Sequence, residues 1–390
     1  MITVAEARAL LFDLVAPLPV ETVPLLQANG RTLAREVTAR RDQPPFDASS
    51  MDGYAVKATE AQKDSMFRVI GESAAGHGFA GSVKAGEAVR IFTGAPVPQG
   101  ADFVVIQEDV SRNGDLITIS DDPGTNDNIR RAGGDFRTGT AMAAPRRLRP
   151  QDIALLASMN IPFVPVTRKP VVALISTGDE LVMPGETPGP DQIIASNTFG
   201  LKAMLDEAGA EARLLPIARD THASLDTAFG LARGADLIVT IGGASVGDHD
   251  LVGQVAADLG MERSFYKIAM RPGKPLMAGR MGDAAMVGLP GNPVSAMVCG
   301  HLFLVPMIRA MLGLGTAVPD LHTARLTGAL GPNGPRDHYM RAVVENGAAR
   351  VFDNQDSALL GVLAVANALV VRPAGDNALP DGADVRYLPI

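Results

Sequence analysis

The sequence predicts a multidomain protein of mixed α/β and β structure, built around a central, doubly wound and mostly parallel α/β domain. Its 390 residues exceed the ~100–200 residues of one typical domain. Between residues 169 and 316, apolar runs alternate with helical patterns, as expected for a parallel sheet covered by helices on both faces. Short β-rich runs with Gly and Pro turns lie on either side of that region, which indicates two further β units.

Residues 3–15 are predicted to form an N-terminal helix. Thr3 and Glu6 have the spacing of a capping box, and Pro17 follows the segment. The early acidic residue argues against a secretory signal, so we expect a cytoplasmic protein. The apolar side chains at helical spacing form one face that needs a partner surface: Val4, Ala7, Leu11 and Leu14.

Residues 44–139 are predicted to form an inserted β-rich module. The runs FRVI, AVRIF, DFVVI and DLITIS are separated by turn residues. Residues 1–43 and 140–168 would then join as one unit, with the proline-spaced segment IPFVPVTRKP (161–170) as the linker to the next domain.

In the predicted α/β domain, 169–316, the strands VVALIS, ARLLPI, ADLIVT and AAMVGL alternate with helical segments. Gly209 and Gly260 follow two of these helices as stop signals. Residues 317–390 contain the runs HYMRAVVE, ARVFD, ALVVRP and DVRYLPI, which predict a C-terminal β-barrel-like domain.

Residues 284–308 contain no charged side chain and are long enough for a membrane span of ~20 residues. The PGNP insertion at 290–293 argues against a span. It divides the stretch into a buried strand and a helix with Asn292 as N-cap and Pro293 at its first position.

Composition excludes several function classes. The formal charge is −8, from 35 basic and 43 acidic residues, which argues against a broad nucleic-acid surface. The one cysteine, Cys299, cannot form an intrachain disulfide or a cysteine metal cluster, and 16 methionines suit a reducing compartment. The six histidines lack metal-ligand spacing, and no G-x-S-x-G nucleophile motif occurs.

The loops after the predicted parallel strands are the first candidates for a ligand site, because ligands bind beyond the carboxyl ends of such strands. STGDEL follows one strand and supplies Ser176, Gly178 and Glu180. IGGASVGDHD follows another, and its glycines Gly242 and Gly243 would let the backbone approach a phosphate closely. The alternative is a glycine-rich turn without a ligand.

Acidic residues beside this predicted anion site suggest a divalent cation. Asp248 and Asp250 would repel phosphate, and Mg²⁺ held by one or two carboxylates would resolve the conflict. Asp220 follows another strand end, so we predict Mg²⁺ ligands at Asp220 and Asp250. The alternative is helix capping by the two later aspartates and surface exposure of Asp220.

A local excess of positive charge also suggests anion capture. Lys267, Arg271 and Lys274 surround a Pro-Gly turn, although a solvated basic loop is the alternative. The turn between Pro290 and Pro293 has backbone donors that could face an oxyanion, or it is a structural turn.

Three polar residues of the β-rich module also lie in turns. Asp52, Thr93 and Asp135 each fit ordinary turn chemistry when taken alone.

Taken together, the motifs SSMDGYAV, RIFTGAPVPQGAD, NIRRAGGDF, STGDEL, SNTFGLKAML, GGASVGDHD, KIAMRPGKP and GLPGNPVSA resemble the molybdopterin molybdenumtransferase family, which includes the E domain of gephyrin. The resemblance spans the chain from about Leu33 to the C-terminus. It implies an elongated, L-shaped subunit in a homodimer, whose α/β domain binds adenylylated molybdopterin and whose partner's β-rich module helps close the site. The implied reaction needs Mg²⁺: molybdate binds, the pyrophosphate link is cleaved, AMP leaves, and the dithiolene holds molybdenum.

The resemblance implies roles for individual residues. Asp220 and Asp250 match carboxylates associated with Mg²⁺ and the nucleotide bond. The other implied catalytic positions are Asp52, Thr93, Asp135, Glu180, Lys267 and Lys274. The implied substrate-binding positions are Ser176, Gly178, Asn197, Gly242, Gly243, Ser245, Arg271, Pro290, Pro293, Arg341 and Ser357.

Three positions depart from the family pattern: Arg271 in place of Lys, Ala244 in place of a frequent Val, and Tyr266 in place of a frequent Trp. None removes a charge, but the planar guanidinium of Arg271 favours bidentate contacts. With one α/β unit in the chain, adenylylation falls to a partner, molybdopterin adenylyltransferase, and the product passes to molybdoenzymes or their chaperones. Neither nucleic acid nor membrane is an expected partner.

Alternative functions are a pterin adenylyltransferase or a scaffold, and tungstate could replace molybdate.

Overall fold

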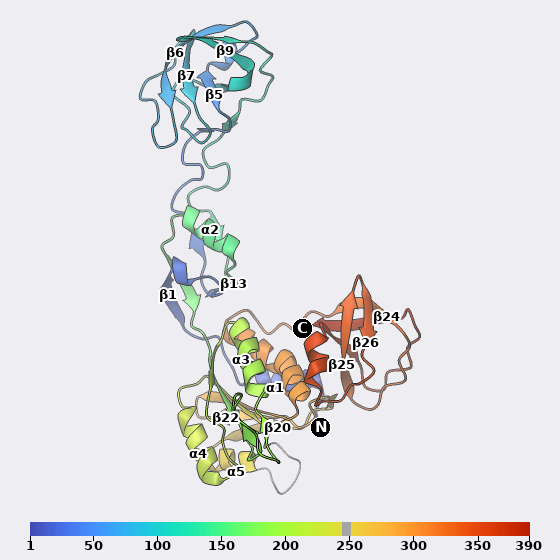
Figure 1. The fold of residues 1–390 in the computed structure, drawn as a ribbon. Coiled ribbons are helices and arrows are strands. Elements are labelled where there is room, and N and C mark those ends of the chain that lie inside the picture. The colour runs from blue at the N-terminus through green and yellow to red at the C-terminus, as the bar shows by residue number, and fades with distance from the viewer. Residues whose placement is uncertain (244–250) are drawn as a thin grey trace.

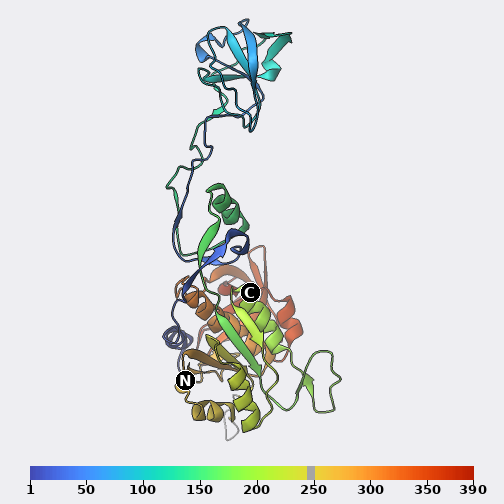
Figure 2. The same ribbon diagram turned by 90° about the vertical axis from the view of Figure 1, so that its left-hand side faces the viewer.

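The computed structural model describes residues 1–243 and 251–390 and has the predicted multidomain architecture. Figure 1 shows an elongated chain with the β-rich module at one end. A small unit containing helix α2 (Pro150–Ser158) follows, and the α/β and C-terminal β domains lie together at the other end. Two extended chain segments connect the module to the small unit, as both views show (Figures 1 and 2).

The N-terminal helix α1 spans Val4–Phe12 and is capped by Thr3, with the capping box to Glu6 as predicted. It ends before the predicted Val15, at the C-cap Asp13. Its buried face packs against helix α7 (Val305–Met311) and strand β20 (Glu262–Tyr266) in the core of the α/β domain. The predicted grouping of α1 with residues 140–168 is therefore wrong, because its apolar face is buried by the other domain.

The small unit is a sheet with the strand order β1-β14-β2-β13, next to α2. The predicted linker is wrong: its residues Phe163–Thr167 form strand β14, which pairs antiparallel with β1 (Val20–Pro24). Val164 and Val166 alternate into the core, so the prolines between them do not prevent a strand. The other strands of this unit are β2 (Thr32–Leu33) and β13 (Arg146–Arg147), and β3 (Val37–Thr38) pairs with β12 (Ala141–Met142) at its exit.

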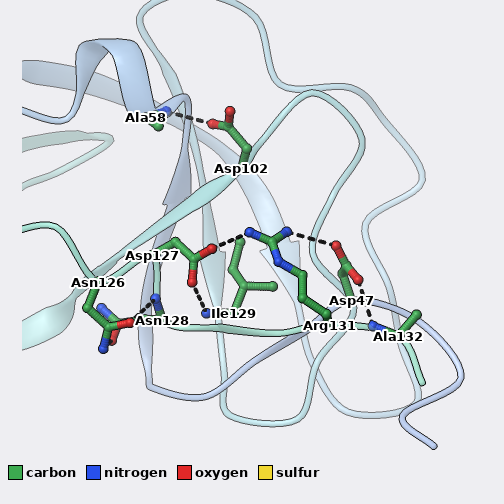
Figure 3. Close-up of polar contacts among 9 residues, drawn as sticks. All are labelled: Asp47, Ala58, Asp102, Asn126, Asp127, Asn128, Ile129, Arg131 and Ala132. Carbon is green, nitrogen blue, oxygen red and sulfur yellow. Dashed lines mark hydrogen bonds and ion pairs between the residues drawn. The ribbon is translucent and has the colours of Figure 1, made fainter. Parts of the chain in front are cut away.

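The module contains a sheet with the order β8-β5-β7-β6-β10-β9. At its base, Arg131 bridges Asp47 and Asp127, and Asp47 also accepts from the Ala132 N–H at 2.8 Å (Figure 3). These bonds fix the segment that leads to Asp135. The strands are β4 (Ala48–Ser49), β5 (Gly53–Val56), β6 (Met66–Ser73), β7 (Glu87–Ile91), β8 (Phe103–Ile106), β9 (Val110–Asn113), β10 (Leu116–Ile119) and β11 (Ile129–Arg130).

The α/β domain has the sheet order β18-β15-β19-β23-β22-β20. The first four strands are parallel and the last two antiparallel, which fits the mostly parallel sheet predicted. Helices α1, α3, α6 and α7 share the core on one face, and α4 and α5 cover the other. The strands are β15 (Val171–Ser176), β18 (Glu211–Leu214), β19 (Leu237–Ile241), β22 (Met277–Met281) and β23 (Ala284–Leu289), with a small pair β16 (Leu181–Val182) and β17 (Ile193–Ile194). The helices are α3 (Asn197–Glu207), α4 (His222–Leu231), α5 (Leu251–Asp258) and α6 (Pro293–Cys299).

The apolar stretch forms the strand and helix that its PGNP turn predicts. Residues Pro293–Met311 make one helix of 19 residues, with a π-helical turn at Gly300–Leu304. By length and composition this helix could cross a membrane, but 78% of its apolar window is buried inside the protein. It is therefore a core helix of the α/β domain.

The C-terminal domain is a closed barrel in the order β25-β26-β24-β28-β27, with β27 pairing back to β25. The predicted runs form β25 (Asp337–Glu345), β26 (Ala348–Val351), β27 (Ala368–Arg372) and β28 (Asp384–Pro389). Strand β24 (His322–Thr327) and helix α8 (Leu360–Val365) were not predicted. The two-residue strand β21 (Met270–Arg271) leaves the α/β domain and pairs with β25, which ties the two domains together.

Candidate functional site

A cleft of about 690 Å³ lies at the carboxyl ends of the central parallel strands. We call it the strand-end cleft. Its position follows from the topology, since the strand order reverses around β15 and leaves room beyond the strand ends. The predicted residues that line it are Ser176, Gly178, Glu180, Asn197, Asp220, Gly242, Gly243, Pro290 and Pro293.

Two close backbone approaches shape this cleft. Gly242 has a φ of +95°, and a Cβ there would lie 2.7 Å from the carbonyl oxygen of Thr177. Gly178 has a φ of +148°, and its Cβ would lie 2.3 Å from Oε2 of Glu180. Both positions therefore favour glycine. The Gly242 N–H donates to the Leu289 carbonyl oxygen at 3.1 Å, which fixes the turn after β19 at the cleft wall.

The strand-end cleft has an acidic wall. Asp220 and Glu180 are exposed there, and neither forms an ion pair within the part of the chain that the structure describes. The Asp220 N–H donates to Oδ1 of Asp179 at 3.2 Å. Arg219 donates instead to the carbonyl oxygens of Asp179 and Leu181, both at 3.0 Å, which fixes the STGDEL loop.

The predicted Asp250 and Ser245 lie outside the described residues, as does the departure at Ala244. Within 1–243 and 251–390, no three His, Cys, Asp or Glu side chains cluster as a metal site. Among the described residues, the carboxylates available for a cation in this cleft are those of Asp220 and Glu180, together with ligand oxygens.

The PGNP turn is held from the side by α3. Asn197 Nδ2 donates to the carbonyl oxygen of Gly291 at 2.7 Å. Asn292 occupies the N-cap position and Pro293 the first helical position, as predicted, but the Asn292 side chain makes no capping hydrogen bond. The cap prediction is therefore wrong in its chemistry, and the Asn292 side chain lines the cleft instead.

A second cleft, of about 760 Å³, lies between the RPGKP segment and the C-terminal barrel. We call it the basic cleft. Pro275, Pro290 and Asn292 line both clefts, so the two are neighbours across the PGNP turn. The other residues of the basic cleft are Arg271, Pro272, Gly273, Lys274, Ser295, Arg336, His338, Met340, Asp353, Asn354, Gln355, Asp356 and Ser357.

Strand pairing concentrates positive charge at the basic cleft. Arg271 on β21 lies opposite His338 on β25, and His338 lies opposite Arg372 on β27. Burial, followed by Arg271, Arg341, Arg372 and Arg336, lowers the pKa of His338 to about 4. The imidazole is therefore neutral near pH 7, because both burial and the surrounding positive charge disfavour the imidazolium.

Arg341 does not line the basic cleft directly. It is 1% exposed, and its backbone N–H and Nε donate to Oε1 of Gln355 at 2.9 and 3.2 Å. Its Nη1 donates to the Asp356 carbonyl oxygen at 2.7 Å. Arg341 thus holds the loop that carries Ser357 into the cleft, while its buried Nη2 lacks an acceptor among the described residues.

Lys267 lies outside the two clefts described above. Its φ is +78°, its N–H donates to the Leu276 carbonyl oxygen at 3.1 Å, and its Nζ lies 5.3 Å from the centroid of the Tyr266 ring. The arrangement makes Lys267 part of the turn before β21 rather than of the cleft wall.

Three predicted residues, at positions 52, 93 and 135, belong to the β-rich module or its base. Figure 1 shows this module far from the α/β domain. Asp52 Oδ1 accepts from the Thr93 N–H at 2.7 Å and from its Oγ1 at 2.8 Å, and these bonds hold the pKa of Asp52 below its usual range. Asp135 donates its N–H to the Gln43 carbonyl oxygen at 2.9 Å. One chain therefore does not bring these residues to its own strand-end cleft.

Sequence reasoning missed Arg336, His338 and the loop at 353–356. Arg336, His338 and Met340 alternate along β25 and its start, so they face the basic cleft together. The alternation in RDHYMR could have shown that these three side chains share one face of a strand. It could not show that this face lines a cleft, because that depends on the pairing of β21 beside β25.

Comparisons with known proteins agree with this architecture. Residues 2–160 match the family described as "MoeA N-terminal region (domain I and II)", 173–310 match "Probable molybdopterin binding domain", and 323–390 match "MoeA C-terminal region (domain IV)". The chain is 34% identical to a molybdopterin molybdenumtransferase of Nostoc sp., covering 100% of this chain and 94% of that protein. It is 39% identical to one of Haemophilus influenzae, covering 80% and 78%. The solved molybdopterin biosynthesis protein of Pyrococcus horikosii superposes with a TM-score of 0.84 at 30% identity, covering 100% of this chain and 99% of that one.

Proposed function

The chain belongs to the molybdopterin molybdenumtransferase family, transferases of molybdenum cofactor biosynthesis, and we propose that it inserts molybdate into adenylylated molybdopterin with Mg²⁺-dependent release of AMP. The observation that carries this proposal is the pairing of two clefts across one turn. The strand-end cleft combines a glycine turn with carboxylates, and the basic cleft beside it is lined by guanidinium and ammonium groups. The first suits a nucleotide-linked phosphate with a cation, and the second suits an oxyanion.

Mg²⁺ fits the residues of the strand-end cleft. Asp220 and Glu180 face it without an ion pair among the described residues, and Mg²⁺ is commonly held by one or two carboxylates plus substrate phosphate oxygens. Together with Asp220, Asp250 is the second proposed ligand, although it lies outside the described residues. When bound, the cation would neutralise charge on the phosphates during cleavage of the pyrophosphate link.

The chain's own residues would position the two substrates. Gly242 and Gly243 present no side chain to the strand-end cleft and would leave room for the phosphates, and the Asn197 hydrogen bond holds the PGNP turn between the clefts. Lys274, Arg271 and Ser357 would hold molybdate by charge-assisted hydrogen bonds. A rigid turn shared by both clefts would keep molybdate beside the pterin when AMP leaves.

We further propose a cytoplasmic homodimer in which the β-rich module of one chain approaches the strand-end cleft of its partner. This would bring Asp52, Thr93 and Asp135 to the strand-end cleft of the partner, since the module that carries them lies far from the α/β domain of its own chain (Figures 1 and 2). Molybdopterin adenylyltransferase would supply the substrate, and molybdoenzymes or their chaperones would receive the product.

Substitution of Asp220 tests the proposed role of the strand-end cleft. Asp220→Asn removes one carboxylate charge with little change of volume and should lower Mg²⁺-dependent AMP release at least 100-fold, the scale for loss of a group that stabilises transition-state charge. Asp226→Asn is the matched control, because it removes the same charge outside the strand-end cleft. Asp226 lies on α4 and lines a different groove, beside the Ala235–Asp236 turn that precedes β19. Wild-type AMP release by Asp220→Asn would refute the role.

A further inference from the structure

We propose that His338 contacts the oxyanion bound in the basic cleft and takes up a proton from solvent as that oxyanion binds. The inference rests on the proposed function in one respect: molybdate is taken as the oxyanion. It goes further by giving a role to a residue that neither the sequence motifs nor the family resemblance assigns.

His338 forms part of the wall of the basic cleft. It is 8% exposed and lines the cleft from β25, between Arg336 and Met340 on the same strand face. The ladder sets Arg271 of β21 directly opposite on one side and Arg372 of β27 on the other. Residues opposite one another in a ladder point to the same side of the sheet, so a ligand beside Arg271 is beside His338 as well.

The charges around His338 are strongly unbalanced. From its own strand and the turn before it come Arg336 and Arg341, from β21 comes Arg271, and from β27 comes Arg372. Lys274, Asp353 and Asp356 face the same cleft from the segments beside it, and Asp337 is its chain neighbour. Asp376 binds the Arg372 side chain and offsets part of that charge.

Burial and the four guanidiniums therefore lower the pKa of His338 to about 4 and keep the imidazole neutral near pH 7 when no oxyanion is bound. A doubly negative oxyanion bound there would offset this positive field, because the imidazole lines the same cleft as the guanidiniums of Arg271 and Arg336. The pKa of His338 then rises on binding, and the proton it gains adds a charge-assisted hydrogen bond to the oxyanion.

Linkage fixes the sign of the pH dependence. The His338 imidazole has a higher pKa in the molybdate complex than in the free protein. Molybdate binding therefore strengthens as pH falls through the His338 pKa of the complex, and the affinity becomes constant below the His338 pKa of the free protein. If oxyanion binding restores the ordinary value of about 6.5, the affinity for molybdate becomes about 10-fold tighter at about pH 5.5 than at about pH 7.5.

Calorimetric titration of the full-length protein with molybdate tests this step. Titrations in two buffers of different ionisation enthalpy count the protons taken up, and repeating them at both pH values gives the affinity change. We expect proton uptake and the 10-fold change in the wild type. His338→Asn and His338→Gln should still bind molybdate near pH 7.5 but lose both effects. His322→Asn is the matched control, since His322 is an exposed histidine on β24 of the same barrel, with its ring tilted 40° against that of Tyr387.

Wild-type binding without proton uptake, or full uptake in both His338 variants, would overturn the inference and leave the proposed function standing. If the wild type binds no molybdate at either pH, the proposed function fails and this inference fails with it. NMR titration of the wild-type imidazole gives the same answer without a variant, because the pKa of His338 should rise when molybdate is added.

Discussion

Replacing Gly242 by alanine tests the geometry of the strand-end cleft most sharply. The added Cβ would lie 2.7 Å from the Thr177 carbonyl oxygen, a backbone atom that cannot rotate away, and the φ of +95° disfavours any side chain. The left-handed backbone costs roughly 1–2 kcal/mol for a residue with a Cβ. Overpacking against the backbone adds about 1–3 kcal/mol. We therefore expect a total loss of about 2–5 kcal/mol in unfolding free energy.

Gly234→Ala is the matched control for this substitution. Gly234 has a φ of +82° but nothing within 4 Å of its Cβ position, and it lies in the turn after α4 in the same domain. It should show the backbone cost alone, about 1–2 kcal/mol. The difference between the variants isolates the close approach to Thr177.

Urea denaturation followed by circular dichroism measures both losses, and AMP release measures the cleft. Gly242→Ala should lower AMP release more than 10-fold, because the turn must shift away from the phosphate position, whereas Gly234→Ala should retain it. Equal stability losses and equal activities in the two variants would refute the reasoning that the turn after β19 depends on this contact.

Two further predictions concern the β-rich module. Thr93→Val removes the hydroxyl that donates to Asp52 and should raise the Asp52 pKa toward its usual range, as measured by NMR titration of the carboxyl carbon. Because the folded-state pKa is depressed, the stabilisation by ionised Asp52 is present above about pH 4 and is lost as pH falls through that lower pKa. An unchanged pKa in the variant would contradict the hydrogen-bond assignment. Mixing inactive Asp52→Asn chains with inactive Asp220→Asn chains should restore AMP release, because a mixed dimer contains one site with both wild-type carboxylates, and failure to recover activity after verified subunit exchange would contradict the shared site.

Local patterns predicted the segments whose structure depends on local chemistry. The Thr3 and Glu6 spacing fixed the start of α1, and the PGNP turn separated strand β23 from α6 at the predicted residues. The strand-end cleft followed from the β-α alternation, since its loops must meet at one sheet edge. The segment 161–170 was misassigned because its prolines suggested a linker, whereas the antiparallel pairing with β1 accommodates them.

The basic cleft could be predicted only in part, because it depends on a long-range pairing. Arg271 and Lys274 were evident from the local excess of positive charge, but β21 has two residues and no periodicity that would reveal its partner. The pairing of β21 with β25, in which Arg271 lies opposite His338, becomes visible only in the structure. Lys267 belongs to the same charged segment, yet its left-handed backbone places it outside both clefts.

The most direct test of the central claim is AMP release from the purified protein supplied with adenylylated molybdopterin and Mg²⁺, with and without micromolar molybdate. The account predicts that molybdate stimulates AMP release and that molybdenum-loaded pterin accumulates in equal amount. No release from a folded protein that binds the pterin would contradict the claim.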